Sequence, residues 1–175
     1  MVERECDSRV YYTDTDSMHL PAHVIPVLEE KYRDKFGMEL IGKGMGQFHT
    51  DFDFKSCFSI VDGKLSPTTV ESKGEIESVA SYFMWKKSYI DKLNDEDGNE
   101  AYHIRLKGVP IKCILNKVNQ DYGGDPMSMF EDFYQGEAVE FKLGSDGHVM
   151  FKTHKNHTIE SVQMIRKVKF DKGRD

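Results

Sequence analysis

The chain has 175 residues, of which 38% are hydrophobic and 31% are charged, and its net charge is −6. This length is enough to bury a core, and the composition lies within the range of soluble globular proteins. The apolar runs are only a few residues long, and the start MVERECDSRV has no apolar signal-peptide core. We therefore expect an intracellular protein that is not secreted and has no membrane span. The odd number and wide spacing of Cys6, Cys57 and Cys113 predict reduced thiols rather than disulfides or a zinc site.

The charge is distributed unevenly along the chain. Residues 1–85 hold 9 Lys/Arg against 15 Asp/Glu, whereas residues 152–174 hold seven basic residues against only Glu160 and Asp171. A basic C-terminal face could contact phosphate groups. A solvated charged surface explains the same composition equally well, so composition alone does not identify a ligand.

The first third of the chain predicts a hairpin, a helix and a strand. Residues 9–20 (RVYYTDTDSMHL) contain two short β-prone runs that meet at a polar centre, which is typical of a hairpin. From about Ala22, apolar residues at helical spacing predict a helix that ends at Gly37. Residues 48–54 alternate between aromatic and polar residues, as a half-buried strand does. Asp62-Gly63 is a hairpin-turn signal.

The aromatic-rich stretch 81–93 (SYFMWKKSYIDKL) predicts extended structure, and we expect Trp85 to lie in the core. A polar loop at residues 94–99 follows, and AYHIRLK resumes a strand. Gly108-Val109-Pro110 indicates a change of direction before a helix over residues 111–119.

The last third predicts one more helix and one more hairpin. Asp125-Pro126 is typical of an N-cap followed by proline at the first helical position, and this helix should end at Gly136. Residues 137–143 and 148–153, joined by GSDG, predict the hairpin. The sequence thus predicts a mixed α+β fold of short strands and two to four helices, with a boundary near residues 75–80.

The most informative residues are the two aspartates of the string Y-T-D-T-D-S at residues 12–17. Asp14 and Asp16 lie at the predicted hairpin tip, and strand residues two apart share a face, so both carboxylates could point at one spot. Their repulsion requires a cation, and oxygen ligands without nearby Cys or paired His favour Mg²⁺ or Mn²⁺ over zinc. Magnesium pairs serve phosphoryl transfer. Taken alone, D-x-D is a weak signal, because such pairs also occur in exposed acidic turns.

The whole string, between an aromatic and an apolar strand, resembles the third polymerase motif of B-family DNA polymerases. Three further landmarks follow in family order. GQFHTD at residues 46–51 is similar to a stretch of the protein-primed, organellar and viral branch. KKSYI at residues 86–90 resembles the family's K-x-Y motif, and KGVP at residues 107–110 resembles the turn that leads into the thumb.

This resemblance implies roles for five residues of the hairpin. Asp16 would be the main metal-binding carboxylate of a two-Mg²⁺ site, and Asp14 would contact the metal or the primer terminus. Tyr12 would pack near the incoming nucleotide, and Thr15 and Ser17 would shape the turn.

The K-x-Y resemblance implies primer contacts further along the chain. Lys87 would reach the primer-terminal phosphate or base, and Tyr89 would hydrogen-bond the DNA backbone. Two residues apart on a strand, the two side chains would share a face. Lys86 competes with Lys87 for the lysine role.

The resemblance therefore implies a partial polymerase palm at residues 1–80, and primer-gripping strands with a small thumb at residues 81–175. The implied activity is template-directed transfer of a nucleotide from a dNTP to a primer 3′-hydroxyl. The sequence lacks the family's D-x-x-S-L-Y-P and K-x-x-x-N-S-x-Y-G motifs, so we expect this chain alone to be inactive. The expected partners are primer–template DNA, a dNTP and an N-terminal polymerase polypeptide that supplies the second aspartate. Exposed strand edges also predict self-association if that partner is absent.

Two other functions stay open. A non-catalytic palm–thumb module would bind DNA or a partner protein without metal dependence. A small Mg²⁺-dependent nuclease or phosphatase would need a further carboxylate cluster, and only Glu71, Glu75 and Glu77 could supply one. Their spacing does not indicate a site. The viral branch implies a host-cell cytoplasm or viral replication site as the location.

Overall fold

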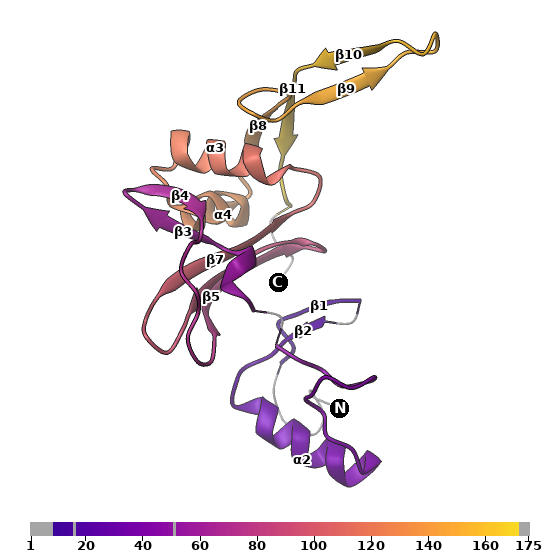
Figure 1. Cartoon of the computed structure of the whole chain (residues 1–175), viewed down its shortest axis with the longest axis vertical. Helices are drawn as coiled ribbons and strands as arrows, with labels where there is room; N and C mark the ends of the chain where they lie inside the picture. Colours follow the sequence, from indigo (N-terminus) through magenta and orange to yellow (C-terminus); the bar gives the residue numbers. More distant parts are fainter. Residues whose placement is uncertain (1–8, 16, 51, 172–175) are drawn as a thin grey trace. The chain divides into compact units, whose positions relative to one another are not determined.

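The computed structural model of the chain describes residues 9–15, 17–50 and 52–171 (Figure 1). The predicted α+β class is confirmed, because the described residues form three α-helices, a five-stranded antiparallel sheet and several two-stranded pairs. The chain divides into two compact units between residues 51 and 52. The proposed functional division near residue 80 stays a prediction, since it concerns palm and thumb roles rather than compactness.

The first unit contains the predicted hairpin and helix. Strands β1 (Tyr12–Asp14) and β2 (Ser17–His19) pair in antiparallel register. Helix α2 (Val24–Phe36) ends at Gly37, whose φ of 66° is left-handed and whose N–H donates to the carbonyl of Arg33. Glycine takes this conformation without steric cost, so the helix ends where the sequence predicts. Among the described residues of this unit, the buried core is small and consists of Val24, Leu28 and Leu40.

The second unit is built around the five-stranded sheet, whose strand order is β4-β3-β7-β6-β5. The strands are β3 (Phe58–Val61), β4 (Lys64–Pro67), β5 (Glu77–Trp85), β6 (Ser88–Asn94) and β7 (Glu100–Leu106). Every pairing in this sheet is antiparallel. The predicted turn between β3 and β4 and the loop between β6 and β7 are confirmed.

Helices α3 (Ile111–Asp121) and α4 (Pro126–Gln135) cover one face of the sheet (Figure 1). The Asp125 side chain accepts a hydrogen bond from the backbone N–H of Met127 at 2.9 Å, which satisfies one of the free donors at the start of α4. Gly136 ends α4 in a left-handed conformation. Helix α4 therefore begins and ends as predicted, whereas α3 begins at the predicted residue and continues two residues beyond the predicted end at 119. The apolar sides of both helices bury the main core. It includes Ile90, Ile104, Ile114, Val118, Met129, Phe130, Phe133 and Phe141.

The last predicted hairpin is wrong, although its strands exist. Strand β8 (Val139–Leu143) pairs with β11 (Met164–Val168), and β9 (Met150–Thr153) pairs with β10 (Ile159–Val162). Figure 1 shows β9 and β10 as a separate hairpin beyond the β8–β11 pair. The reason lies at Gly144, which approaches the carbonyl of Val162 so closely that a Cβ would collide with it. Because Gly144 has no side chain, the segment around Val162 can pack against it, and β8 pairs with β11 instead of forming a local hairpin with β9.

The strand predicted at residues 48–54 is also wrong. Phe48 forms only an isolated bridge with Ile41, and Phe54–Ser56 is a single 3-10 turn, η1. The Asp53 side chain accepts a hydrogen bond from the N–H of Lys55 at 2.9 Å. Aspartate side chains compete in this way with strand ladders for backbone donors, which the alternating pattern does not reveal.

Two of the predicted thiols can be located. Cys57 and Cys113 are buried and free, as expected, whereas Cys6 lies outside the described residues. Burial raises the pKa of the Cys57 thiol to about 11, because the thiolate would lose its hydration. No helix in the described ranges is long and apolar enough to cross a membrane.

Candidate nucleic-acid interface and carboxylate hairpin

Asp14 lies at the end of β1, half-buried and directly opposite Ser17. The Thr15 hydroxyl donates to Asp14 Oδ1 at 3.2 Å, and the Ser17 hydroxyl donates to the Asp14 carbonyl at 3.1 Å. Thr15 has a φ of 57°, in the left-handed region. The two hydroxyls therefore stabilise the turn around the Asp14 carboxylate. Asp16 lies outside the described residues.

The period-two reasoning that placed both carboxylates on one strand face does not apply to this turn. A left-handed residue directly follows Asp14, so the regular strand ends there. Tyr12, at the other end of β1, packs edge-on against His19 with 5.5 Å between ring centroids. The hairpin thus fixes Tyr12 and Asp14 on one short element.

As a metal ligand, Asp14 offers oxygen donors of the kind that Mg²⁺ prefers. Across residues 9–15, 17–50 and 52–171, no three His, Cys, Asp or Glu side chains lie together in a way that could hold a metal ion. One half-buried carboxylate fits a magnesium site only as one ligand among several. Further ligands, such as Asp16, would have to complete the site.

Lys87 lies in the turn between β5 and β6, not on a strand with Tyr89, so the expectation that the two share a strand face is wrong. Trp85 pairs with Ser88, which leaves Lys86 and Lys87 as the two turn residues. Lys87 has a φ of 61°, a conformation that glycine or asparagine adopts more easily. Both lysines are exposed at the tip of the hairpin.

Trp85 is 72% exposed, so the expectation that it lies in the core is also wrong. The register between β5 and β6 shifts between Phe83 and Trp85, which is a β-bulge or a similar irregularity. A bulge inserts a residue and re-aims the side chains that follow it. The sequence pattern of the strand could not show this shift.

Tyr89 is half-buried on the face of the sheet away from α3 and α4. Its ring lies 6.1 Å from that of Phe83 and 5.6 Å from that of His103. Next to it on β6, Asp91 is fully buried, accepts hydrogen bonds from Ser81 (2.6 Å) and Ser78 (3.1 Å), and lies 3.9 Å from His103 Nδ1. This packing orients the Tyr89 ring.

Two further basic residues lie on β7 and directly after it. Arg105 pairs with Tyr89 across β6 and β7, so the two side chains share a sheet face. The backbone N–H of Lys107 donates to the Ser88 hydroxyl at 3.2 Å, which joins the end of β7 to the start of β6. Both side chains are exposed. The alternation in AYHIRLK was the signal that could have found them, because it places residues 103, 105 and 107 on one face.

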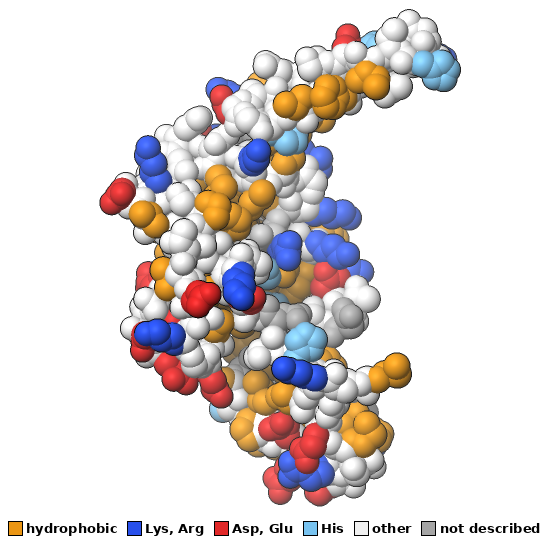
Figure 2. All heavy atoms as spheres, in the orientation of Figure 1, with side chains coloured by type: hydrophobic (Ala, Val, Ile, Leu, Met, Phe, Trp, Pro, Cys, Tyr) orange, Lys and Arg blue, Asp and Glu red, His pale blue; other side chains and the backbone are white. Residues whose placement is uncertain are grey.

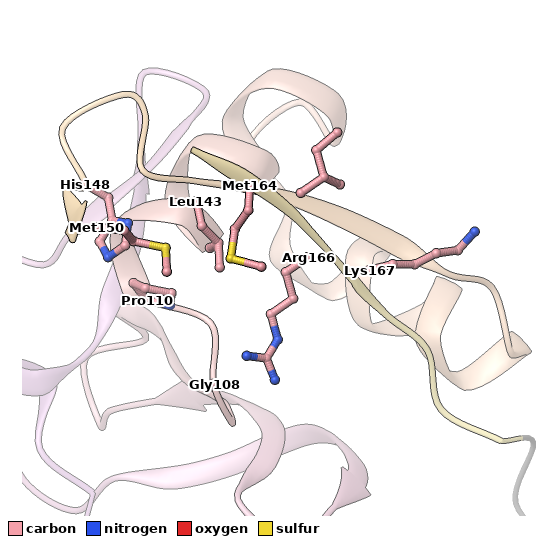
Figure 3. A pocket seen from close by; sticks show the side chains of 9 residues that line it. Gly108, Pro110, Leu143, His148, Met150, Met164, Arg166 and Lys167 are labelled. Carbon is pink, nitrogen blue, oxygen red and sulfur yellow. The ribbon is translucent and has the colours of Figure 1, made fainter. Parts of the chain in front are cut away.

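A third basic side chain reaches the same end of the sheet from β11. If Gly108 carried a Cβ, that atom would lie 2.6 Å from Nη2 of Arg166, so the absence of a side chain leaves room for the guanidinium. Figure 3 shows Arg166 pointing towards Gly108 at a cavity of about 500 Å³. The cavity is walled mainly by apolar side chains, including Pro110, Leu143, Met150 and Met164. No local sequence signal links Arg166 to Gly108.

Five cations thus gather at one end of the five-stranded sheet, which we call the basic end: Lys86, Lys87, Arg105, Lys107 and Arg166. Figure 2 shows blue side chains gathered there, where β5 ends. Within the described ranges, the side chains of Lys86, Arg105, Lys107 and Arg166 make no hydrogen bond or ion pair. Cations that the protein does not neutralise are available to an anionic ligand.

No protein-family model, curated protein or solved structure matches this chain. Evidence for a function therefore comes from the sequence motifs and from the geometry of the Asp14 hairpin and the basic end.

Proposed function

We propose that this chain supplies metal-binding carboxylates and primer–template contacts to a DNA polymerase that resembles the B family. The observation that carries the proposal is the basic end, which surrounds the K-x-Y string. Four of its cations, Lys86, Arg105, Lys107 and Arg166, have no carboxylate partner within the described ranges. A polymerase needs such a surface beside its primer terminus, because the DNA backbone brings one negative charge per nucleotide.

The chemistry of the basic end suits phosphate. The Arg105 and Arg166 guanidinium groups can donate two parallel hydrogen bonds to one phosphate, whereas lysines act as point charges. Contacts of this kind position a nucleic acid without reading its sequence. The ring of Tyr89, held by Phe83 and His103, would direct its hydroxyl at the DNA backbone from the same face as Arg105.

In this proposal Asp14 and Asp16 hold Mg²⁺ together with a carboxylate from outside these 175 residues. Bound Mg²⁺ would neutralise charge as a phosphoryl group is transferred to the primer 3′-hydroxyl. The chain's own part is to hold Asp14 in the turn, because the Thr15 hydroxyl donates to its carboxylate and the Ser17 hydroxyl donates to its backbone carbonyl. Tyr12, on the same strand, would pack near the incoming nucleotide.

The partner polypeptide is part of the proposal. The sequence contains neither the second catalytic aspartate motif nor the triphosphate-binding helix of the family. Phosphoryl transfer depends on a complete arrangement of positioned charges, so the residues present would not suffice. Apolar side chains left exposed on the first unit are consistent with a covering partner. They include Val27, Phe36, Met38, Ile41 and Met45.

A non-catalytic DNA-binding module is the second candidate, because the basic end alone could bind DNA and no three-ligand metal cluster occurs in the described part of the chain. The two candidates differ in whether the carboxylates matter. If the chain bound DNA and Asp16→Asn had no effect on primer extension, the non-catalytic module would be favoured.

The test is primer extension with Mg²⁺ and dNTPs, first with this chain alone and then with a candidate N-terminal polymerase polypeptide. We expect extension only in the mixture. Asp16→Asn should reduce the rate by about a hundredfold or more, as loss of a charge-stabilising active-site group does. Asp34→Asn, an exposed carboxylate on α2, is the matched control and should leave the rate unchanged.

Two results would contradict the catalytic proposal. One is extension that survives Asp16→Asn. The other is a mixture that binds primer–template, measured by fluorescence anisotropy, but never extends it.

A further inference from the structure

Trp85 is the only tryptophan of the chain, and it stands at the tip of the β5–β6 hairpin within the basic end. Its side chain is 72% exposed. In the part of the chain that the structure describes, its indole makes no aromatic or cation–π contact. Tryptophan is highly buried on average, so a large indole left in water at a charged tip indicates a ligand rather than packing.

The backbone around Trp85 holds this exposed position. The register shift after Phe83 lies directly before Trp85, and the left-handed Lys87 lies two residues after it. Irregularities of this kind cost conformational energy and often occur where a strand end presents a side chain to a ligand. Ser88, the partner of Trp85, is itself buried and accepts the hydrogen bond from Lys107, so the base of the hairpin is anchored.

The surroundings of the indole restrict the class of ligand. Lys86 and Lys87 follow it directly, and Arg105 and Lys107 lie at the same sheet end, so a cationic ligand would be repelled. An anionic ligand that also has a flat π-face fits both features. Nucleic acid is that ligand, because its bases stack on aromatic side chains while basic residues contact the phosphates on either side.

We propose that Trp85 is a stacking platform for an unpaired nucleobase, so that the basic end binds single-stranded DNA beside the primer–template duplex. In a duplex, both faces of each internal base are covered by neighbouring base pairs. An unpaired base exposes its face to the indole. This inference rests on the proposed DNA-binding function and adds a preference for single strands to it.

Because the chain has one tryptophan, its intrinsic fluorescence reports on Trp85 alone. The full chain would be titrated with oligo(dT) of about 16 nucleotides, a length matched to known single-strand sites. The parallel probes are a blunt duplex, a primer–template with a single-stranded overhang, and poly-glutamate, which carries negative charge but no bases. We expect strong quenching by oligo(dT) and the overhang, weak quenching by the blunt duplex, and none by poly-glutamate.

Variants test the stacking contact by anisotropy. Trp85→Ala should weaken oligo(dT) binding about tenfold, and Trp85→Phe should retain most of the affinity because its ring still stacks. Tyr134→Ala is the matched control: Tyr134 is a 58% exposed aromatic residue on α4 that does not belong to the basic end. Circular dichroism would verify that each variant is folded, which exposed positions should permit.

The outcomes separate the inference from the proposed function. DNA binding without quenching, or with unchanged affinity in Trp85→Ala, would overturn the stacking role and leave the DNA-binding function intact. Equal quenching by the blunt duplex would overturn the preference for unpaired bases. Quenching by poly-glutamate but not by oligo(dT) would assign the tip to an acidic protein instead. Failure to bind any DNA would overturn both proposals.

Discussion

The two units support their candidate site residues with very different amounts of described core packing. Among the described residues of the first unit, which carries the carboxylate hairpin, the buried core consists of Val24 and Leu28 on α2 and Leu40 after it. The basic end of the second unit stands on a core of fifteen buried residues between the sheet and its helices. A two-stranded hairpin is marginally stable without further strands or a covering element. The packed sheet therefore fixes the basic end within this chain, whereas the hairpin that carries Asp14 has less packing of its own among the described residues.

Under the proposed function, the two units would therefore have different roles: the second would contact phosphates and the first would bind metal. Phosphate contacts tolerate some freedom, because charges act over several ångströms, yet the residues proposed for them lie on the unit with the larger described core. Metal ligands need tight geometry, yet Asp14, the proposed ligand, lies on the unit with the smaller core among the described residues. The proposed partner polypeptide would supply the missing packing by covering the first unit, and it would thereby fix the position of the hairpin.

The largest effect is expected from the core of the second unit. Phe133 is fully buried, and its ring lies 5.6 Å from Phe130, 6.5 Å from Phe141 and 5.2 Å from Phe170. Phe133→Ala should lower the free energy of unfolding by about 3–5 kcal/mol, through lost burial and the cavity that remains. Urea denaturation followed by circular dichroism would measure this. The control is Tyr134→Ala: this neighbour is 58% exposed, and its ring lies 5.7 Å from that of Tyr82, so the loss should be no more than about 1 kcal/mol. An equal loss in both variants would contradict the conclusion that Phe133 lies in the core and Tyr134 at the surface.

A smaller and more local effect is expected in the first unit. Leu28 is 6% exposed, and Leu28→Ala should cost about 2–3 kcal/mol. If the units are stabilised separately, amide hydrogen exchange should accelerate in α2 and stay unchanged in β6. Val27→Ala, at an exposed position on the same helix, serves as the control. Faster exchange in β6 would show that the units fold as one and would remove the contrast between them.

The smallest effect is expected at the helix starts, which also differ between the units. Asp125 accepts hydrogen bonds from the Met127 N–H and from the Ser128 hydroxyl at 2.6 Å, whereas His23, at the start of α2, makes no side-chain cap. Asp125→Ala should therefore cost about 1 kcal/mol, and His23→Ala should cost almost nothing. Thermal unfolding of the two variants would compare them. If His23→Ala lowered stability more than Asp125→Ala, the His23 side chain would have to stabilise α2 through a contact other than an N-terminal cap.

Local signals in the sequence predict the elements whose boundaries depend on single residues. Gly37 and Gly136 end helices because of their left-handed conformations, and Asp125-Pro126 begins one. The pairing of β8 with β11 could not be predicted in this way. It depends on a close approach between Gly144 and Val162, which are far apart in the sequence.

The candidate site also contains some residues that local sequence signals indicate and others that only the tertiary structure brings together. The hairpin around Asp14 follows from a motif that is contiguous in the sequence. The K-x-Y motif draws attention to Lys86 and Lys87, but it does not predict that they lie in a turn. Arg105 and Arg166 join the basic end only through strand pairing and through the space beside Gly108. Trp85 is exposed because of a register shift that its apolar neighbours do not reveal. A pattern of residue types predicts a strand, but it does not predict where the strand departs from regular geometry.

The pairing of β8 with β11 makes the β9–β10 hairpin an insertion into the tip of a longer one. The chain leaves the pair after Leu143 and returns at Met164, and these two residues are register partners. Near its base this segment contacts the core through Met150 and helix α3 through the carbonyls of Asp146 and Gly147. Residues at its outer end, around 154–157, can be added or removed without shifting either core strand, and the entropy of closing such a loop rises only slowly with its length. In evolution, this projection is therefore free to change its reach and its surface while the core that supports it keeps the same sequence constraints.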